Sequence, residues 1–222
     1  MIIVLYRGVC REWERCLENQ VQFIHSIDKD VIYGIHHWDK KYERLTNREI
    51  GLSKQELPVF FKDKKVKYTV SPCEIIDRFD GSLEAKSSLY STLRSIIYSY
   101  KNSLELYPDM PDDQLIISLR YDGVVNYVFS DNGQAFVGMW NIRDRPVIEI
   151  PEVNDICFIT RKHILDKLCQ LSLDDILTIT DGAIYWEHYF YKIFNHLTCG
   201  NVTIDKNLHG AVVRPFEISY CS

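Results

Sequence analysis

Residues 1–39 read MIIVLYRGVC REWERCLENQ VQFIHSIDKD VIYGIHHWD, and this stretch decides the fold. The apolar, β-branched run Ile2–Tyr6 predicts a buried strand that ends just before a glycine turn. Apolar residues at helical spacing predict a helix over Arg11–His25, and Val31–His36 predicts a second strand. A strand, a glycine turn, a helix and a strand form a βαβ unit, which implies a parallel sheet covered by helices.

The rest of the chain continues this alternation of strands and helices. Residues 39–56 are polar and show no periodicity, which predicts a long connection. We predict further helices over Leu83–Leu106, Arg161–Leu171 and Ile184–Leu197. Further strands are predicted over Val59–Phe61, Val66–Val70, Gln114–Leu119, Gly123–Phe129, Phe136–Trp140, Val147–Ile150, Ile156–Thr160 and Ala211–Pro215. We therefore expect one α/β domain over residues 1–222, with a mixed, mostly parallel sheet flanked by helices.

The charge of the chain limits its partners. A formal net charge of −5 means that the whole molecule is not an electrostatic trap for nucleic acid. One local patch, FFKDKKVKY, mixes aromatic residues with four lysines: Lys62, Lys64, Lys65 and Lys67. The patch is consistent with a phosphate-binding surface, or with a solvated loop or an edge strand protected by lysines.

The cysteines and the hydropathy pattern indicate a compartment. The chain has 7 cysteines, an odd number, and no C-x-x-C pair, so the sequence suggests neither a disulfide framework nor a zinc site. We expect reduced thiols in a soluble, cytoplasmic protein. No segment approaches the roughly 20 apolar residues that span a membrane.

Polar and charged residues collect at the predicted strand boundaries. Ligands of open α/β sheets bind outside the carboxyl ends of the strands, so these residues predict a site. They are Arg7 and Gly8 after the first strand, His36 to Asp39 after the second, Arg120 and Asp122 after the central strand, and Asn154 and Asp155 before a later one.

Arg120 and Asp122 admit two interpretations. They line a polar mouth just beyond the strand, or they neutralise each other as a structural ion pair, because an unpaired buried ion costs several kcal/mol. The adjacent histidines His36 and His37 alternate along a strand, one inward and one outward, so we do not expect both on one metal ion. Nucleotide-binding glycine fingerprints and a nucleophile elbow are missing from the sequence.

Six stretches, in order, resemble successive blocks of small GT-A-like glycosyltransferases of bacterial surface-polysaccharide synthesis. They are LYRGVCREWERCLENQ, IHHWD, SSLYSTLRSIIYSY, ISLRYDGVV, PEVNDICFITRKHILDKLCQL and YWEHYFYKIFNHL, and they span most of the chain. Two features depart from the pattern: the first aspartate of the D-x-D motif is missing, and the chain is short for an acceptor domain. The resemblance implies a single GT-A-like, Rossmann-like domain.

The resemblance also implies roles for individual residues. Asp122 stands where the D-x-D aspartate would bind a metal, and a base for the acceptor is expected among two carboxylates, Asp155 and Glu187. The donor-binding residues it implies are Arg7, Gly8, Arg11, His37, Trp38, Asp39 and Arg120.

Transfer of a sugar from a nucleotide diphosphate needs positive charge beside the departing diphosphate, because negative charge develops on it. Mg²⁺ or Mn²⁺ typically binds through one or two carboxylates plus phosphates, and arginines alone are the other way to stabilise the leaving group. The implied activity is transfer of a sugar from a nucleotide-diphosphate donor to an acceptor hydroxyl.

The acceptor and even the class of function stay open in the sequence. The acceptor is a surface glycan, or hydroxymethylcytosine in phage DNA, which would place the protein in a bacterial or phage-infected cytoplasm. The alternative class is a non-catalytic nucleotide-sugar-binding or scaffold protein on the same fold.

Overall fold

The computed structural model of the 222-residue chain places most of the predicted elements. It describes residues 1–7, 13–28, 30–38, 41–42, 49–50, 65–72, 87–121, 123–127, 157–183, 186–202 and 208–212.

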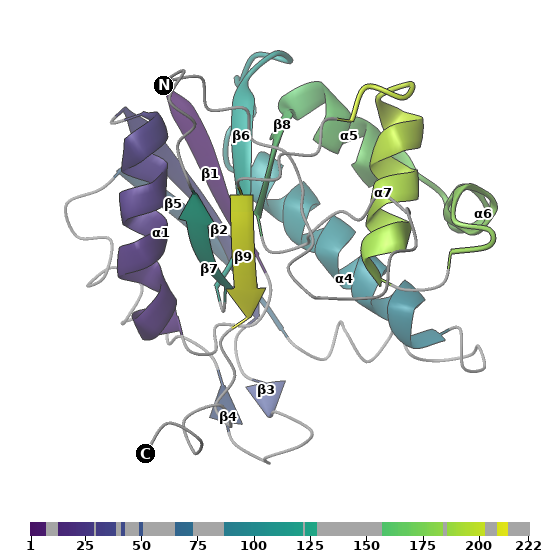
Figure 1. The fold of residues 1–222 in the computed structure, drawn as a ribbon, viewed down its shortest axis with the longest axis horizontal. Helices are drawn as coiled ribbons and strands as arrows, with labels where there is room; N and C mark the ends of the chain where they lie inside the picture. The colour runs from purple at the N-terminus through teal and green to yellow at the C-terminus, as the bar shows by residue number, and fades with distance from the viewer. Residues whose placement is uncertain are drawn as a thin grey trace.

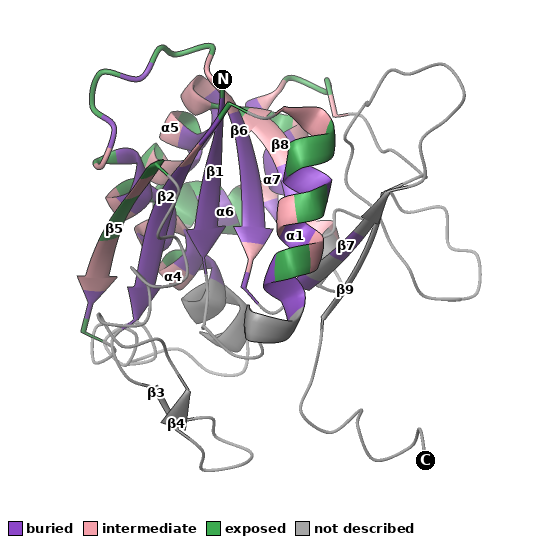
Figure 2. Ribbon diagram, turned by 90° about the vertical axis from the view of Figure 1, so that its left-hand side faces the viewer, coloured by how far each residue is buried: buried purple, intermediate pink, exposed green. Residues whose placement is uncertain are grey.

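A five-stranded mixed sheet forms the centre of the described structure, in the order β5-β2-β1-β6-β8. Its strands are β1 (Ile2–Arg7), β2 (Val31–Trp38), β5 (Lys65–Ser71), β6 (Leu115–Arg120) and β8 (Cys157–Arg161). The first four run parallel to one another, and β8 runs antiparallel to β6. β1 and β2 are buried almost throughout (Figure 2), as expected of strands covered on both faces.

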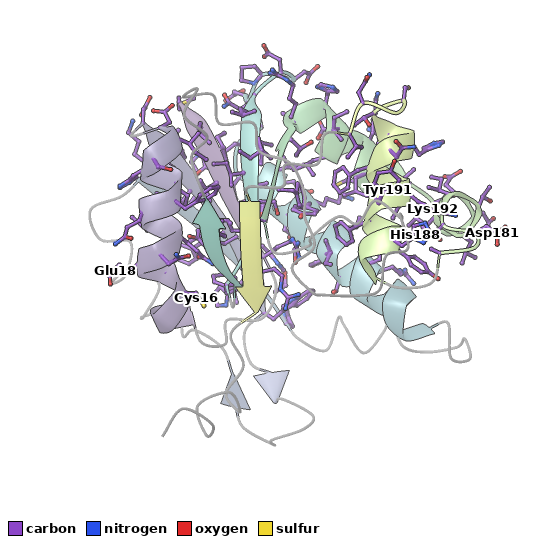
Figure 3. All side chains as sticks on the ribbon, in the orientation of Figure 1. Cys16, Glu18, Asp181, His188, Tyr191 and Lys192 are labelled. Carbon is purple, nitrogen blue, oxygen red and sulfur yellow. The ribbon has the colours of Figure 1, made fainter. Side chains whose placement is uncertain are left out.

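Helices cover both faces of this sheet (Figure 1). On one face lies α1 (Trp13–Ile27), which packs through Leu17, Phe23 and Ile24. Figure 3 shows its amphipathic character, because Cys16 points toward the sheet side while Glu18 points outward. The other face is covered by α4 (Ser87–Leu104), α5 (Lys162–Gln170) and α7 (Trp186–Leu197), with α6 (Leu173–Ile179) packed beside them.

Two smaller antiparallel pairs complete the described strands. β3 (Lys41–Tyr42) pairs with β4 (Glu49–Ile50), and β7 (Gly123–Tyr127) pairs with β9 (Leu208–Val212). β7 follows β6 directly in the chain and lies next to α1.

The predicted α/β fold class, a mixed and mostly parallel sheet flanked by helices, is confirmed. The strand and helix boundaries differ from the predictions by a few residues, and β9 begins three residues before the predicted strand at Ala211–Pro215. The prediction of one domain over residues 1–222 stays a prediction. The strands predicted at Val59–Phe61, Phe136–Trp140 and Val147–Ile150 lie outside the described residues.

The sequence predictions missed two features of the described structure. The connection at residues 39–56 contains β3 and β4, whose two residues each are too short to show a period. The helix α6 was also missed, although it has a local signal. Its N-cap Ser172 accepts from Asp175 N at 3.1 Å and Asp175 accepts from Ser172 N at 2.9 Å, which is a capping box.

Close packing around position 34 in β2 leaves room only for glycine. A Cβ atom at this position would lie 2.7 Å from Leu5 Cδ2 and 3.1 Å from Tyr107 Cε2. The Tyr107 ring lies against this strand because its hydroxyl donates to Tyr33 O at 2.7 Å. The missing side chain therefore lets the segment after α4 pack directly on the sheet.

We expect Gly34→Ala to reduce the free energy of unfolding by about 1–3 kcal/mol, because added volume in a packed core forces neighbours off their rotamers. Urea unfolding measures this loss. Leu5→Val removes the atom nearest to the new methyl group, so the double variant should lose less than the sum of the two single losses. Strictly additive losses would show that the Leu5 contact does not cause the effect.

Candidate functional site at the carboxyl edge of the sheet

The order of the strands marks one point on the sheet edge. From β1 the chain passes through α1 to β2 on one side, and after β5 it returns through α4 to β6 on the other side of β1. The strand order therefore reverses between β1 and β6, which is the topological switch point where α/β sheets bind ligands. The register pairs Arg7 with Arg120 at this point, as the last residues of β1 and β6.

The Arg7 side chain is buried beneath this edge, with 2% of its surface exposed. Its Nε donates to Ser118 Oγ at 3.3 Å, and Ser118 Oγ is 2.7 Å from Tyr100 Oη. The guanidinium carbon lies 5.7 Å from the ring centroid of Tyr100 and 5.9 Å from that of Phe190. The Arg7 guanidinium thus lies near two aromatic rings, one from α4 and one from α7, and both helices cover the same face of the sheet.

The contact of Arg7 with Phe190 also locates the first turns of α7. Phe190 lies three residues after Glu187, which is the second residue of this helix. The helix turn that carries the predicted base therefore lies near the carboxyl end of β1, although the Glu187 side chain itself is outside the described atoms.

The turn from β6 into β7 is held from α1. Gln20 Nε2 donates to Arg120 O at 2.7 Å and to Gly123 O at 2.5 Å. Asn19 Oδ1 accepts from Val125 N at 2.6 Å. These bonds tie the segment that contains the predicted R-x-D motif to the helix that follows β1.

The end of β2 contributes a buried cluster of aromatic and polar groups. The Trp38 ring stacks on Tyr98 of α4 with centroids 5.4 Å apart and planes 22° apart. His36 contacts both rings edge-on, and its Nε2 lies 2.9 Å from Ser71 Oγ at the end of β5. His37 Nδ1 lies 3.0 Å from Trp38 O.

The two histidines lie on opposite faces of the sheet, as strand alternation predicts, but both are buried. The expectation that one faces outward is wrong, because helices cover both faces. Since Ser71 Oγ donates to Tyr98 Oη at 3.4 Å, we assign the His36 proton to Nε2, where Ser71 accepts it. The buried Nδ1 of His36 has no hydrogen-bond partner among the described residues.

Burial, with a smaller contribution from neighbouring His37, lowers the pKa of His36 from its ordinary value of 6.5 to about 3. The unfolded chain takes up a proton below about pH 6.5 while the folded protein stays neutral until about pH 3. The contribution of His36 to stability is therefore complete above pH 6.5 and decreases as the pH falls from 6.5 toward 3.

We expect the wild type to lose about 1.4 kcal/mol of unfolding free energy per pH unit in this window through His36. His36→Gln should lack this part of the slope. Urea unfolding of both proteins at pH 7, 6, 5 and 4 gives the comparison. Parallel pH profiles for the two proteins would show that His36 is not the titrating group.

The structure brings four of the predicted donor-binding residues to one edge: Arg7, His37, Trp38 and Arg120. β8 starts at the same edge, because Cys157 pairs with Leu119 near the end of β6. Six other predicted site residues lie outside the described residues and stay predictions: Gly8, Arg11, Asp39, Asp122, Asn154 and Asp155.

The sequence predictions missed the groups that support this edge. They are Ser118 and Tyr100 beneath Arg7, and Asn19 and Gln20 beside the turn. Gln20 had a signal, because it lies at helical spacing between Leu17 and Ile24 on an apolar helix face. A polar residue in such a stripe indicates a buried hydrogen-bond partner.

The described part of this edge carries cationic groups. Among the described residues no group of three His, Cys, Asp or Glu side chains is arranged to hold a metal ion. The described groups suit a diphosphate stabilised by arginines. Binding of Mg²⁺ or Mn²⁺ therefore rests on Asp122 and stays a prediction.

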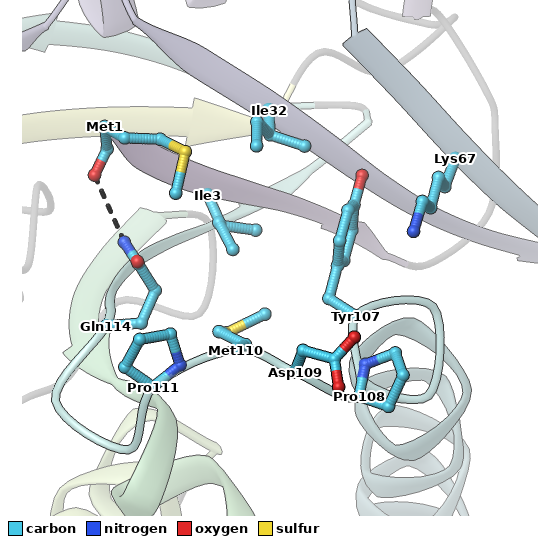
Figure 4. Close-up of a pocket in the computed structure, with 10 residues that line it drawn as sticks. All are labelled: Met1, Ile3, Ile32, Lys67, Tyr107, Pro108, Asp109, Met110, Pro111 and Gln114. Atoms are coloured by element: carbon cyan, nitrogen blue, oxygen red, sulfur yellow. Dashed lines mark hydrogen bonds between the residues drawn. The ribbon is translucent and has the colours of Figure 1, made fainter.

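A hollow of about 210 Å³ lies at the opposite edge of the sheet (Figure 4). Its lining is largely apolar and includes Ile3, Ile32, Tyr107 and Met110, with Lys67 at one side. Ile3 and Ile32 lie near the starts of β1 and β2, so this hollow is separate from the arginine edge.

In the parts of the chain that the structure describes, no helix has the length and apolar character needed to cross a bilayer.

Comparison with known proteins adds one finding. No model of a known protein family matches the sequence, and no curated protein matches it significantly. Two solved structures of galactosyltransferase LgtC are similar to this chain: a complex with donor and acceptor sugar analogs, and an active-site mutant. Each shows 12% sequence identity and a TM-score of 0.45, over 89% of this chain and 70% of the other.

Proposed function

We propose that this protein is a glycosyltransferase that moves a sugar from a nucleoside-diphosphate donor to an acceptor hydroxyl. The observation that carries the proposal is the pairing of Arg7 with Arg120 at the switch point of the sheet. The ordered sequence blocks that resemble GT-A-like glycosyltransferases support the same reading, because their predicted donor-binding residues include both arginines.

Arg120 and Arg7 have distinct parts in this proposal. Arg120 is half-buried at the tip of β6 and is the group that contacts the diphosphate. Arg7 is buried below it, so its charge acts on the diphosphate from beneath the edge. His37 and Trp38 form the adjoining buried wall, and Gly8, Arg11 and Asp39 follow β1 and β2 in the sequence as further donor-binding residues.

The transfer step follows from this arrangement. The bond between the anomeric carbon and the phosphate oxygen breaks, and its electron pair leaves with the diphosphate, whose charge the arginines stabilise. The acceptor oxygen bonds to the anomeric carbon, and its proton passes to Asp155 or Glu187 as the base. Mg²⁺ or Mn²⁺ held by Asp122 would supply further positive charge to the leaving group.

A calorimetric titration with UDP, GDP, ADP and CDP tests the proposal on the protein as it exists. We expect at least one of these diphosphates to bind, and the affinity to fall in Arg120→Gln. Arg161→Gln is the matched control, because Arg161 ends β8 at the opposite edge and bonds Asp113 O. If none of the four binds the wild type, the proposed donor site is wrong.

The non-catalytic alternative, a nucleotide-sugar-binding or scaffold protein, predicts the same binding. It differs in the fate of the donor, because transferases commonly hydrolyse their donor slowly in the absence of acceptor. Binding without any release of sugar or nucleotide would favour the alternative.

For the acceptor, we propose a glycan hydroxyl rather than hydroxymethylcytosine in DNA. Lys65 lies at the start of β5 and pairs with Asp30 at 3.4 Å. Lys67 donates to Leu106 O at 2.9 Å and lies 4.6 Å from the Tyr107 ring centroid. Both lysines thus contact other groups of the protein.

The position of these lysines also favours the glycan. The seven-residue strand β5 is about 20 Å long, so Lys65 at its start is far from the arginine edge at the strand ends. This supports the prediction of an edge strand protected by lysines, while Lys62 and Lys64 lie outside the described residues. A gel shift at low salt with hydroxymethylated and ordinary duplexes tests the acceptor, and a shift of the hydroxymethylated duplex would favour DNA.

A further inference from the structure

The β6–β7 turn is held by two side chains of α1 that are far from it in the sequence. The Gln20 side chain is fully buried, with 0% exposed, and its one amide nitrogen donates to two carbonyl oxygens, those of Arg120 and Gly123. One residue earlier, Asn19 Oδ1 accepts from Val125 N at 2.6 Å. Three backbone groups of the segment 120–125 are therefore satisfied from a single helix turn.

A buried amide side chain is unusual on this apolar face of α1. Its neighbours at helical spacing, Leu17 and Ile24, belong to the apolar core, and an apolar residue at position 20 would extend that core. The two acceptors also define the orientation of the amide, because only its nitrogen can donate to carbonyl oxygens. Gln20 Oε1 has no hydrogen-bond partner among the described residues, so the whole polar function of this side chain is directed at the turn.

The turn so held is the one that presents the proposed diphosphate-binding groups. Arg120 ends β6, and in the sequence Asp122 falls between the two residues, Arg120 and Gly123, whose carbonyl oxygens accept from Gln20. The same helix α1 begins five residues after Gly8 in the sequence, so it joins the segment after β1 to the segment after β6. These are the two segments on either side of the switch point.

We propose that Gln20, assisted by Asn19, is a positioning residue that holds the end of β6, with Arg120, and the start of β7 in register with the end of β1 for sugar transfer. This inference rests on the proposed function. Gln20 touches neither the donor nor the reacting atoms, and acts only through the backbone of the turn. A misplacement of about 1 Å in such a segment can reduce a rate by about 100-fold.

Gln20→Met tests the inference, because it keeps the length of the side chain and removes the donor. Two controls share the helix: Gln22→Met changes the same residue type on the exposed side, and Ile24→Val loosens the same core without touching the turn. The readouts are amide hydrogen exchange over residues 120–127 and the kcat and KM of donor hydrolysis. We expect Gln20→Met to speed exchange in this segment by at least about tenfold and to lower kcat by about 10- to 100-fold. We expect neither control variant to speed exchange in this segment or to lower kcat.

A second pair of variants covers the case in which Gln20→Met fails to fold. Asn19→Asp retains an oxygen that accepts from Val125 N, whereas Asn19→Leu removes it. We expect Asn19→Asp to keep the wild-type exchange and kcat, and Asn19→Leu to lose both.

The outcomes separate this inference from the proposed function. Wild-type protein that hydrolyses no nucleotide sugar overturns the proposed function, and with it the catalytic purpose of the Gln20 bonds, even where exchange shows that they exist. Active wild type with an equally active, equally protected Gln20→Met variant overturns the positioning role alone. A loss of kcat of the same size in Ile24→Val would also overturn it, because core loosening would then explain the effect.

Discussion

Asp122→Asn is expected to lower sugar transfer by roughly 100- to 1,000-fold while the melting temperature stays near that of the wild type. The change keeps the shape of the side chain and removes its charge. If the carboxylate acts on the diphosphate through a divalent cation, the amide cannot replace it, because Mg²⁺ and Mn²⁺ prefer anionic oxygen ligands. Rates of donor consumption with Mn²⁺ present, compared with thermal melting of both proteins, give the result.

Chelation with EDTA tests the role of a metal ion separately from the role of the Asp122 carboxylate. We expect EDTA to stop the wild type and added Mn²⁺ to restore it, whereas a site that uses arginines alone would be indifferent to EDTA. The structural ion pair between Arg120 and Asp122 predicts the opposite pattern for Asp122→Asn. A variant with normal turnover and reduced stability would identify that ion pair and remove Asp122 from the mechanism.

Arg120→Gln is the second change with a large expected effect, a loss of about 100-fold in kcat/KM for the donor. Arg120 is the half-buried cation at the tip of the central strand and lies beside Arg7 in the sheet register. A charged donor of hydrogen bonds to a leaving diphosphate contributes more in the transition state than in the ground state, because negative charge grows on the departing oxygen. Steady-state kinetics with saturating acceptor measure the loss.

The control for Arg120→Gln is Arg161→Gln, which changes the same residue type at the far edge of the sheet. It should leave kcat/KM within about twofold of the wild type, in line with surface substitutions away from a site. Equal losses in both variants would mean that net charge, and not position, determines the effect.

The sequence was sufficient to predict the central βαβ unit because its signals are local. The apolar run Ile2–Tyr6 and the spacing of Leu17, Val21 and Ile24 are read from a few neighbouring residues. The gathering of Arg7 and Arg120 followed from a general rule, since carboxyl ends of parallel strands share one edge. The register of the sheet confirms that these two arginines are neighbours.

Other features depend on contacts that no local pattern encodes. The sequence around Cys157–Arg161 predicts a strand, but its antiparallel direction depends on pairing with β6. His36 is buried against Tyr98 of α4, and His37 is buried as well, which strand alternation alone does not state. The bonds from Gln20 to the turn at Arg120 join residues 100 positions apart, so only the polar residue in an apolar stripe indicated them.

The central claim, that the arginine edge holds a nucleotide-sugar donor for transfer, is tested most directly by donor hydrolysis. The purified protein is incubated with a panel of nucleotide sugars and Mn²⁺, and released nucleoside diphosphate is measured against Arg120→Gln and Arg161→Gln. We predict release from at least one donor by the wild type and by Arg161→Gln, and about 100-fold less by Arg120→Gln. Release from no donor, or equal release by all three proteins, would contradict the claim.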